Sequence, residues 1–270
     1  FCSLSMNSLK IMGILNVTPD SFSDGGYWLN QKDAITHGEE MIEFGANIID
    51  VGGESTKPNS EKVEIKEEIK RIIPVISNLS KKGYLVSADT RNSLVMQHAI
   101  DNGAQIINDV SGMNDPLTPS IIRENNVSII IMHMQGNPSN MQNNPKYQFA
   151  PIDIFKFLEN RIEFALAEGI KLENIAIDPG FGFGKTPRHN MQIISWLSLF
   201  QCLGVPLMLG ASRKSSIGAL SRGEKPKNRI GGSLVLAHFG KLFGAQLLRV
   251  HDVKETCQAM RINESVISEI

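Results

Sequence analysis

Short apolar runs rich in isoleucine and valine recur along the whole chain, with room for a helix between successive runs. Most of these runs lack polar alternation, which is typical of parallel strands that are covered on both faces. The segments between them show helical periodicity, as Phe155, Leu158, Ile162 and Ala165 do. The eight apolar runs lie near 11–15, 47–51, 84–88, 105–110, 127–132, 174–177, 205–209 and 246–250.

Eight strand–helix units in a chain of 270 residues predict an α/β fold, a (β/α)8 TIM barrel that forms a single domain. A doubly wound open sheet is the structural alternative, but no Gly-x-Gly-x-x-Gly follows the first run. We expect the barrel to span residues 11–261. Residues 1–10 would form an N-terminal extension or linker, and residues 262–270 a C-terminal tail.

Helix-boundary signals fit this division. Asp115 followed by Pro116 predicts a cap and a first helical residue, and Pro151 predicts the start of the fifth helix. Gly169 is placed to end that helix. Asp252 and Glu255 have the spacing of a capping box for the last helix.

Composition and charge exclude some classes of binding partner. A net charge of −1 and the lack of long basic runs argue against a nucleic acid or a membrane surface held by bulk electrostatics, so any anionic ligand needs a local cluster. Cys2, Cys202 and Cys257 have no metal-like spacing and suit a reducing compartment. With no apolar run near 20 residues, a cytoplasmic protein is expected. Because the chain begins with Phe1, we expect it to have been cut from a longer polypeptide.

The stretch from Asn174 to Lys185 combines a strand end with the chemistry of a site. Asp178 can accept two parallel hydrogen bonds, and the glycines and phenylalanines that follow offer close backbone approach and flat apolar faces. A planar heterocycle with adjacent N–H donors would suit a site made of these residues. Taken alone, the stretch is equally typical of a turn after a strand. It is not a phosphate-binding P-loop, because Pro179 occupies a position that requires glycine.

In the predicted barrel, the polar residues that end the strands would converge on one mouth. Arg249 and His251 share a face by the period of two and, with the last helix beginning just beyond, suit a phosphate. Taken singly, such residues also have structural explanations: caps, an interior His133, or a Glu54–Arg91 pair. The strand-end residues are Asn16, Glu54 to Pro58, Asp89, Asn108 and Asp109, Met132 to Met134, Asp178, Ser212 to Lys214, Arg249 and His251.

The segments that contain these residues, in this order and over nearly the whole chain, resemble the dihydropteroate synthases, which are pterin-binding barrels. The resemblance is carried by residues 15–26, 52–56, 89–90, 107–109, 132–136, 178–185, 212–215 and 249–252. It implies condensation of 6-hydroxymethyl-7,8-dihydropterin diphosphate with 4-aminobenzoate, with Mg²⁺ as cofactor and pyrophosphate released. Such a protein would be a transferase of an alkyl group other than methyl, in folate biosynthesis, and a sulfonamide target. A homodimer and a fused upstream pyrophosphokinase domain are further expectations.

The resemblance also implies roles for individual residues. The catalytic set is Asn16, Asp89, Asp178, Lys214, Arg249 and His251. The pterin-binding set is Asp89, Asn108, Met132, Asp178, Phe183, Lys214 and Arg249. The diphosphate would contact Asn16, Thr56, Lys57, Arg249 and His251, with the metal at Asn16. The aminobenzoate would lie among Phe22, Thr56, Pro58, Phe183, Ser212 and Lys214.

Two positions depart from the family pattern. Lys57 stands where such enzymes usually have arginine, which keeps the charge but loses a bidentate fork. Ala88 precedes Asp89 where valine is more usual. Two other functions remain open: a pterin-dependent methyltransferase that serves a corrinoid protein, and a non-catalytic pterin-binding paralogue. The diphosphate residues argue against the first, and the full set of metal and phosphate residues against the second.

Overall fold

A computed structural model describes residues 1–2, 4–18, 27–54 and 63–269. Its centre is a sheet of eight strands in the order β6-β5-β4-β3-β2-β1-β8-β7, and the neighbouring strands that pair are parallel. A parallel bridge between Ile177 and Leu207 joins β6 to β7, so the strands form a nearly closed barrel. The strands are β1 (Lys10–Asn16), β2 (Ile48–Gly52), β3 (Val86–Asp89), β4 (Ile106–Asp109), β5 (Ser128–Met132), β6 (Ile175–Asp178), β7 (Met208–Leu209) and β8 (Leu247–Val250).

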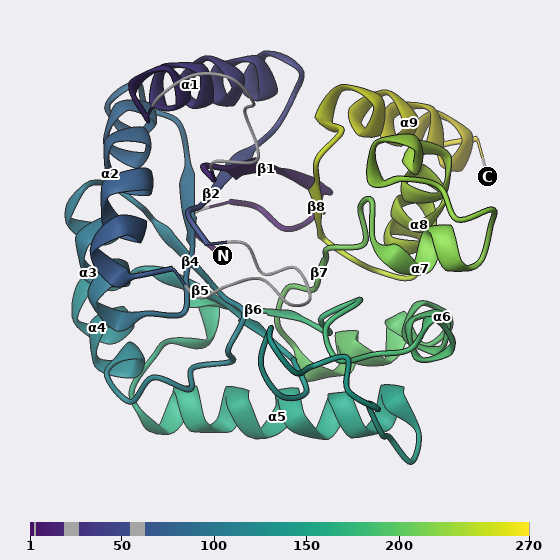
Figure 1. Cartoon of the computed structure of the whole chain (residues 1–270). Coiled ribbons are helices and arrows are strands. Elements are labelled where there is room, and N and C mark those ends of the chain that lie inside the picture. The colour runs from purple at the N-terminus through teal and green to yellow at the C-terminus, as the bar shows by residue number, and fades with distance from the viewer. Residues whose placement is uncertain (3, 19–26, 55–62, 270) are drawn as a thin grey trace.

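Helices surround the strands on the outside (Figure 1). The predicted eight strand–helix units and single-domain barrel are therefore confirmed. The helices are α1 (Tyr27–Glu43), α2 (Ile65–Lys81), α3 (Ser93–Asp101), α4 (Thr118–Asn125), α5 (Ala150–Ala167), α6 (Pro187–Ser195), α7 (Ser215–Ala219), α8 (Ile230–Leu242) and α9 (Val253–Ile267). Short 3-10 turns occur at η1 (Leu172–Asn174), η2 (Leu197–Leu203) and η3 (Pro226–Asn228). The last helix continues beyond position 261, and the domain boundaries stay a prediction.

Two of the predicted helix boundaries are confirmed and two are wrong. Proline is in the first turn of α5, and Gly169 follows that helix with a φ of 85°. However, α4 begins at Thr118 rather than at Pro116. The Asp115 carboxylate is shared: Oδ1 accepts from the backbone N–H of Leu117 in the turn before α4, and Oδ2 accepts from the backbone N–H of Ser93 at the start of α3, both at 3.0 Å. Asp252 precedes α9 but makes no side-chain cap. Its carboxylate accepts from Arg213 Nε at 2.9 Å instead.

The core has two layers. The larger one lies between the strands and the helices and contains the outward-facing side chains of the strands. The smaller one, which we call the lower layer, fills the barrel near the N-terminal ends of the strands. It consists of Met12, Ile48, Ile106, Ile130, Ala176, Met208 and Leu247.

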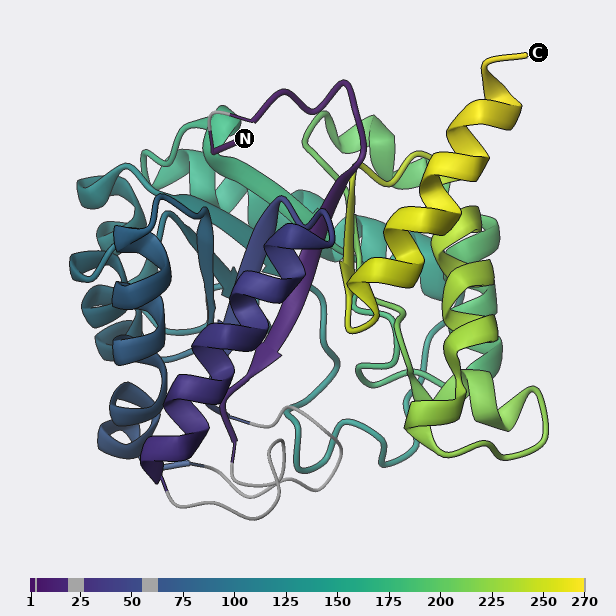
Figure 2. The ribbon, with the colours of Figure 1, turned by 90° about the horizontal axis from the view of Figure 1, so that it is seen from above.

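The N-terminal segment covers this end of the barrel. Phe1, Cys2, Leu4 and Met6 pack against the lower layer, and the backbone N–H of Cys2 donates to Ser128 Oγ at 3.1 Å. Figure 2 shows the segment before β1 crossing this end of the barrel. The apolar core therefore extends through the barrel to the covered end, which leaves the opposite end for polar chemistry. Among the helices within the described ranges, none has the length and apolar character needed to cross a membrane.

Candidate functional site

In several strands the inward-facing positions change from apolar to polar within two residues. In β2 Ile48 is followed two residues later by Asp50, in β4 Ile106 by Asn108, and in β8 Leu247 by Arg249. Side chains two residues apart point to the same side of a strand, so these polar groups lie directly above the lower layer. The polar ring at the C-terminal ends of the strands is therefore built from the same pattern as the core beneath it.

Arg249 connects the polar residues of several strands. Its Nε donates to Asp50 Oδ2 and its Nη2 donates to Asp89 Oδ2, both at 2.6 Å. Asp50 Oδ2 also accepts from Asn108 Nδ2 at 3.0 Å. Burial acts to lower the pKa of Arg249, but Asp50 and Asp89 outweigh it and hold that pKa above its usual value. Burial also raises the pKa of Asp89 to about 7, against the attraction of Arg249.

Asp178 faces the same space as Arg249. A Cβ built on Gly210 would lie 3.4 Å from Asp178 Oδ2 and 3.8 Å from Arg249 Cβ, so the two side chains flank one point at the end of β7. Asp178 is buried, and its Oδ1 accepts from the backbone N–H of Gly180 at 2.7 Å. Burial raises the pKa of this carboxylate, while Gly180, Lys214 and Arg249 oppose the rise. The expectation that Asp178 and Arg249 share one mouth is met.

Lys214 and Phe183 form an amine-over-ring pair beside this carboxylate. Lys214 Nζ lies 3.9 Å from the centroid of the Phe183 ring, which is within the range of a cation–π contact. Burial and Arg249 lower the pKa of Lys214 to about 8, and Asp178 opposes this shift. Phe183 packs with Met132 and two further apolar side chains. Phe183 and Met132 therefore form an apolar wall of the mouth that can contact a flat ring, while the Lys214 amine remains a hydrogen-bond donor.

Asn16 is the last residue of β1, and Ser212 and His251 lie just beyond the ends of β7 and β8. A Cβ on Gly52 would lie 3.5 Å from Asp89 Oδ2 and 3.7 Å from Asn16 Oδ1, which places Asn16 next to the Arg249 network. His251 Nδ1 lies 3.1 Å from Ser212 Oγ. Burial, followed by Arg249 and other nearby cations, lowers the pKa of His251 to about 3. The imidazole is therefore neutral at pH 7.

Some predicted residues are outside the described ranges, namely Phe22, Thr56, Lys57 and Pro58. The segment that contains the last three is flanked by described residues that contact each other. Glu54 forms a double hydrogen bond with Arg91, at 3.0 and 3.1 Å, and its Oε1 also accepts from the backbone N–H of Val63 at 3.2 Å. The structural pairing of Glu54 with Arg91 is therefore confirmed.

Sequence reasoning missed Asp50 and Lys185. Asp50 is fully buried, and a lone carboxylate inside the apolar run 47–51 was the signal that could have revealed it. Lys185 Nζ is buried and lies 2.9 Å from His133 Nδ1 and 2.8 Å from the backbone O of Phe183. Burial lowers the pKa of Lys185 well below its usual value. His133 is thus an interior partner of a lysine, as its place between methionines suggested.

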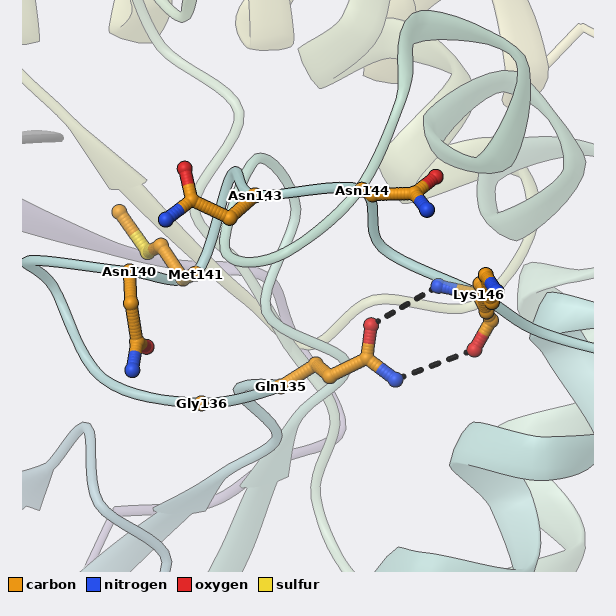
Figure 3. A pocket seen from close by; sticks show the side chains of 7 residues that line it. All are labelled: Gln135, Gly136, Asn140, Met141, Asn143, Asn144 and Lys146. Carbon is orange, nitrogen blue, oxygen red and sulfur yellow. Dashed lines mark hydrogen bonds between the residues drawn. The ribbon is translucent and has the colours of Figure 1, made fainter.

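The segment between β5 and α5 forms a pocket of about 460 Å³ beside the mouth (Figure 3). Its lining includes Lys146 and several side-chain amides. Among these, Gln135 exchanges two hydrogen bonds with the backbone of Lys146, at 3.0 and 3.1 Å. Met141 lines the pocket and also belongs to the apolar group of Phe183 and Met132. The pocket thus adjoins the wall of the mouth. Within the described ranges, no group of three or more His, Cys, Asp or Glu side chains has the arrangement of a metal site.

Known proteins match the chain over nearly its full length. The model of the pterin binding enzyme family matches residues 12–251. The dihydropteroate synthase of Escherichia coli K12 is 42% identical over 267 residues, which cover 98% of this chain and 94% of the relative.

Solved structures agree. The structure of the Yersinia pestis dihydropteroate synthase in a sulfonamide drug complex has a TM-score of 0.92 and 41% identity, covering 99% of this chain and 97% of that one. The Xanthomonas albilineans enzyme in complex with 7,8-dihydropteroate has a TM-score of 0.89 and 38% identity, with coverages of 97% and 95%.

Proposed function

The chain belongs to the pterin-binding enzyme family, and within it to the dihydropteroate synthases, and we propose that the mouth between Asp178 and Arg249 is its active site. The reaction condenses 6-hydroxymethyl-7,8-dihydropterin diphosphate with 4-aminobenzoate and yields 7,8-dihydropteroate and pyrophosphate. The observation that carries the assignment to this mouth is the meeting of Asp178 and Arg249 beside Gly210. Asp178, which can accept hydrogen bonds from a heterocycle, and Arg249, which can bind a leaving anion, therefore border the same space.

The pterin ring is assigned to the deep side of the mouth. Its amidine-like edge would donate to Asp178, and Asp89 and Asn108 would take further ring N–H groups. Asn108 supports this role, because its buried Oδ1 accepts no hydrogen bond from the part of the chain that the structure describes. Phe183 with Met132 would contact one face of the ring, and Lys214 would donate to a ring acceptor.

The diphosphate is assigned to the outer side, with Asn16, His251 and Arg249 and with the predicted Thr56 and Lys57. Mg²⁺ commonly binds through one or two protein oxygens together with substrate phosphates and waters, so a single amide oxygen at Asn16 fits that mode. When bound, the metal would neutralise negative charge on the leaving pyrophosphate. A neutral His251 can donate one hydrogen bond to the diphosphate, and the approach of an anion would raise the pKa of its imidazole.

The mechanism that this placement supports is a largely dissociative substitution. Breaking the C–O bond leaves positive charge on the pterin methylene, which the electron-rich dihydropterin delocalises, and negative charge on pyrophosphate. The aniline nitrogen of 4-aminobenzoate is a free nucleophile at pH 7, so its attack needs no general base, and the proton that the new C–N bond makes acidic passes to pyrophosphate or water. Ser212 and Phe183, with the predicted Phe22 and Pro58, would hold the aminobenzoate so that its amine faces the methylene carbon.

A homodimer is the assembly we propose. Val235, Phe239 and Leu242 lie on one face of α8 and are 54%, 38% and 52% exposed. Apolar side chains at this spacing form a stripe that a second copy of the chain could cover. The expected upstream pyrophosphokinase domain stays a prediction.

The decisive experiment measures pyrophosphate release from dihydropterin diphosphate with and without 4-aminobenzoate, in the presence of Mg²⁺ and again after chelation. A synthase releases pyrophosphate only with the amine and forms dihydropteroate in equal amount. Release without the amine would indicate hydrolysis. No release by protein that still binds the pterin would refute the proposed function.

A further inference from the structure

The turn after β6 supports Lys214 through Gly182. Gly182 has a φ of 86°, and a Cβ at this position would lie 3.2 Å from Lys214 Cδ. The lysine stem therefore passes over Gly182 before its Nζ reaches the face of the Phe183 ring. Because Phe183 is the next residue in the chain, the Gly182 peptide sets the position of the ring and of the surface on which the lysine lies.

Side chains from two other segments hold the polar groups of Gly182. The N–H of Gly182 donates to Asn190 Oδ1 at 2.8 Å, and the carbonyl of Gly182 accepts from Gln142 Nε2 at 2.7 Å. Asn190 belongs to α6, while Gln142 lies in the segment between β5 and α5, next to the pocket-lining Met141. The peptide units on both sides of the Gly182 Cα are therefore held by side chains, and the turn itself is closed by the backbone N–H of Phe183, which donates to the carbonyl of Gly180 at 3.0 Å.

Asn190 also connects this turn to the segment that contains Lys214. It is fully buried, and its Nδ2 donates to Ser216 Oγ at 2.8 Å. A backbone N–H can only donate, so Oδ1 must face Gly182 and the amide orientation is determined. Ser216 is buried in α7, just after Lys214. One amide group thus links the two chain segments whose side chains form the Lys214–Phe183 pair.

We propose that Asn190 and Gln142 are positioning residues of the pterin site, which hold the Gly182 peptide so that the Lys214 amine lies over the Phe183 ring. The proposal rests on the proposed function, because it takes the Lys214–Phe183 pair as a pterin contact. Neither residue needs to touch the substrate. Losing either hydrogen bond lets Gly182 move, and with it the surface that orients the amine.

The test compares two site variants with two matched controls. Gln142→Ala removes an exposed amide that donates to a backbone carbonyl, and so does Gln201→Ala, where Nε2 donates to the carbonyl of Phe243 at 3.0 Å, remote from the mouth. Asn190→Ala removes a buried helical amide, and so does Asn263→Ala, whose partner is His238 at 2.6 Å. Each control loses a similar contact without changing Gly182.

The readouts are the dissociation constant of 6-hydroxymethyl-7,8-dihydropterin by calorimetry and the separate kcat and KM values for the two substrates. We expect the pterin dissociation constant to rise about fivefold in Gln142→Ala, which loses one hydrogen bond of roughly 1 kcal/mol. In Asn190→Ala, which loses two, it should rise about tenfold or more. The pterin KM should rise in parallel, and the KM for 4-aminobenzoate should change less. Both controls should bind pterin within about twofold of the unchanged protein.

A conservative variant separates positioning from mere folding. In Asn190→Asp one carboxylate oxygen can still accept from Gly182, and the Ser216 hydroxyl can rotate to donate to the other, so part of the lost pterin affinity should return. Folded Gln142→Ala and Asn190→Ala proteins that bind pterin as well as the controls would overturn the proposal. If Asn190→Ala does not fold, Gln142→Ala decides by itself. Failure of the unchanged protein to bind pterin would instead refute the proposed function.

Discussion

The two ends of the barrel use the inward-facing sides of the same strands for opposite purposes. At the lower end, Ile48 and Leu247 belong to an apolar layer that the N-terminal segment covers. Two residues further along these strands, Asp50 is fully buried and pairs at 2.6 Å with Arg249, whose side chain is 14% exposed. The comparison teaches that a change of two residues along a strand separates a group that stabilises the fold from a group that can serve the reaction.

The ends also differ in how completely their atoms are satisfied. The lower layer is an apolar core, in which burial is favourable without directional partners. At the upper end Asp50 Oδ1 and Asn108 Oδ1 are buried, and no hydrogen bond reaches them from the residues that the structure covers. Buried polar atoms without partners reduce stability unless a ligand supplies the missing partner. At the upper end, the ring N–H groups of a bound pterin could supply the partners that these two oxygens lack.

Removing the charge that holds the upper end together should have the largest effect. In Arg249→Met both Asp50 and Asp89 lose their cation, and breaking a buried pair in this way typically costs about 3–5 kcal/mol. We expect a loss of this size in the free energy of unfolding, measured in urea, and loss of synthase activity. Arg222→Met, at an exposed position, is the control. An unchanged unfolding free energy would mean that the network adds nothing to the fold.

A cavity at the lower end should cost stability alone. Ile130 is fully buried in the lower layer, and isoleucine-to-alanine changes in cores cost about 2–5 kcal/mol. In Ile130→Ala we expect a lower unfolding free energy but a kcat/KM within about twofold of the unchanged protein at a temperature where both are folded. A large fall in kcat/KM would show that the two ends are not separable.

Truncating Asp178, the carboxylate assigned to the pterin, should have the opposite result: weaker pterin binding with little change in stability. Asp178→Ala would leave ligand donors unpaired, each costing roughly 1–3 kcal/mol, so the pterin dissociation constant should rise about tenfold or more. Stability should change little, because the removed charge was buried and burial already raised its pKa. Asp178→Asn, which keeps the shape and one acceptor, should lie between. Equal pterin binding by all three proteins would remove Asp178 from the site.

The same contrast explains which features could be predicted from the sequence. Parallel strands covered on both faces produce continuous apolar runs, so all eight strands were found, and their ends pointed to the mouth. Asp50 was missed because it lies within such a run and its partner, Arg249, is 199 positions away in the chain. Asp252 was misassigned as a side-chain cap because its carboxylate pairs with Arg213, and the start of α4 was misplaced although one oxygen of Asp115 accepts from the nearby Leu117, because the other oxygen accepts from Ser93; local spacing does not contain these tertiary partners.

The two ends should also differ in the pH dependence of stability. His251 has a folded pKa of about 3, lowered by burial and then by Arg249, Arg213 and Lys214, against an ordinary value of 6.5. Between these values the unfolded chain takes up a proton that the folded chain refuses, so stability falls as pH drops from 6.5 towards 3.

Variants at the two ends of the barrel should show which end causes this fall of the unfolding free energy with pH. In His251→Asn, urea unfolding measured at intervals from pH 7 to pH 4 should show a shallower fall than in the unchanged protein. Ile130→Ala should show the original slope, displaced downward by a constant, because no titratable side chain belongs to the lower layer. Identical slopes in the unchanged protein and His251→Asn would contradict the lowered pKa of the half-buried His251. In that case a charged imidazole would already face the diphosphate before it binds.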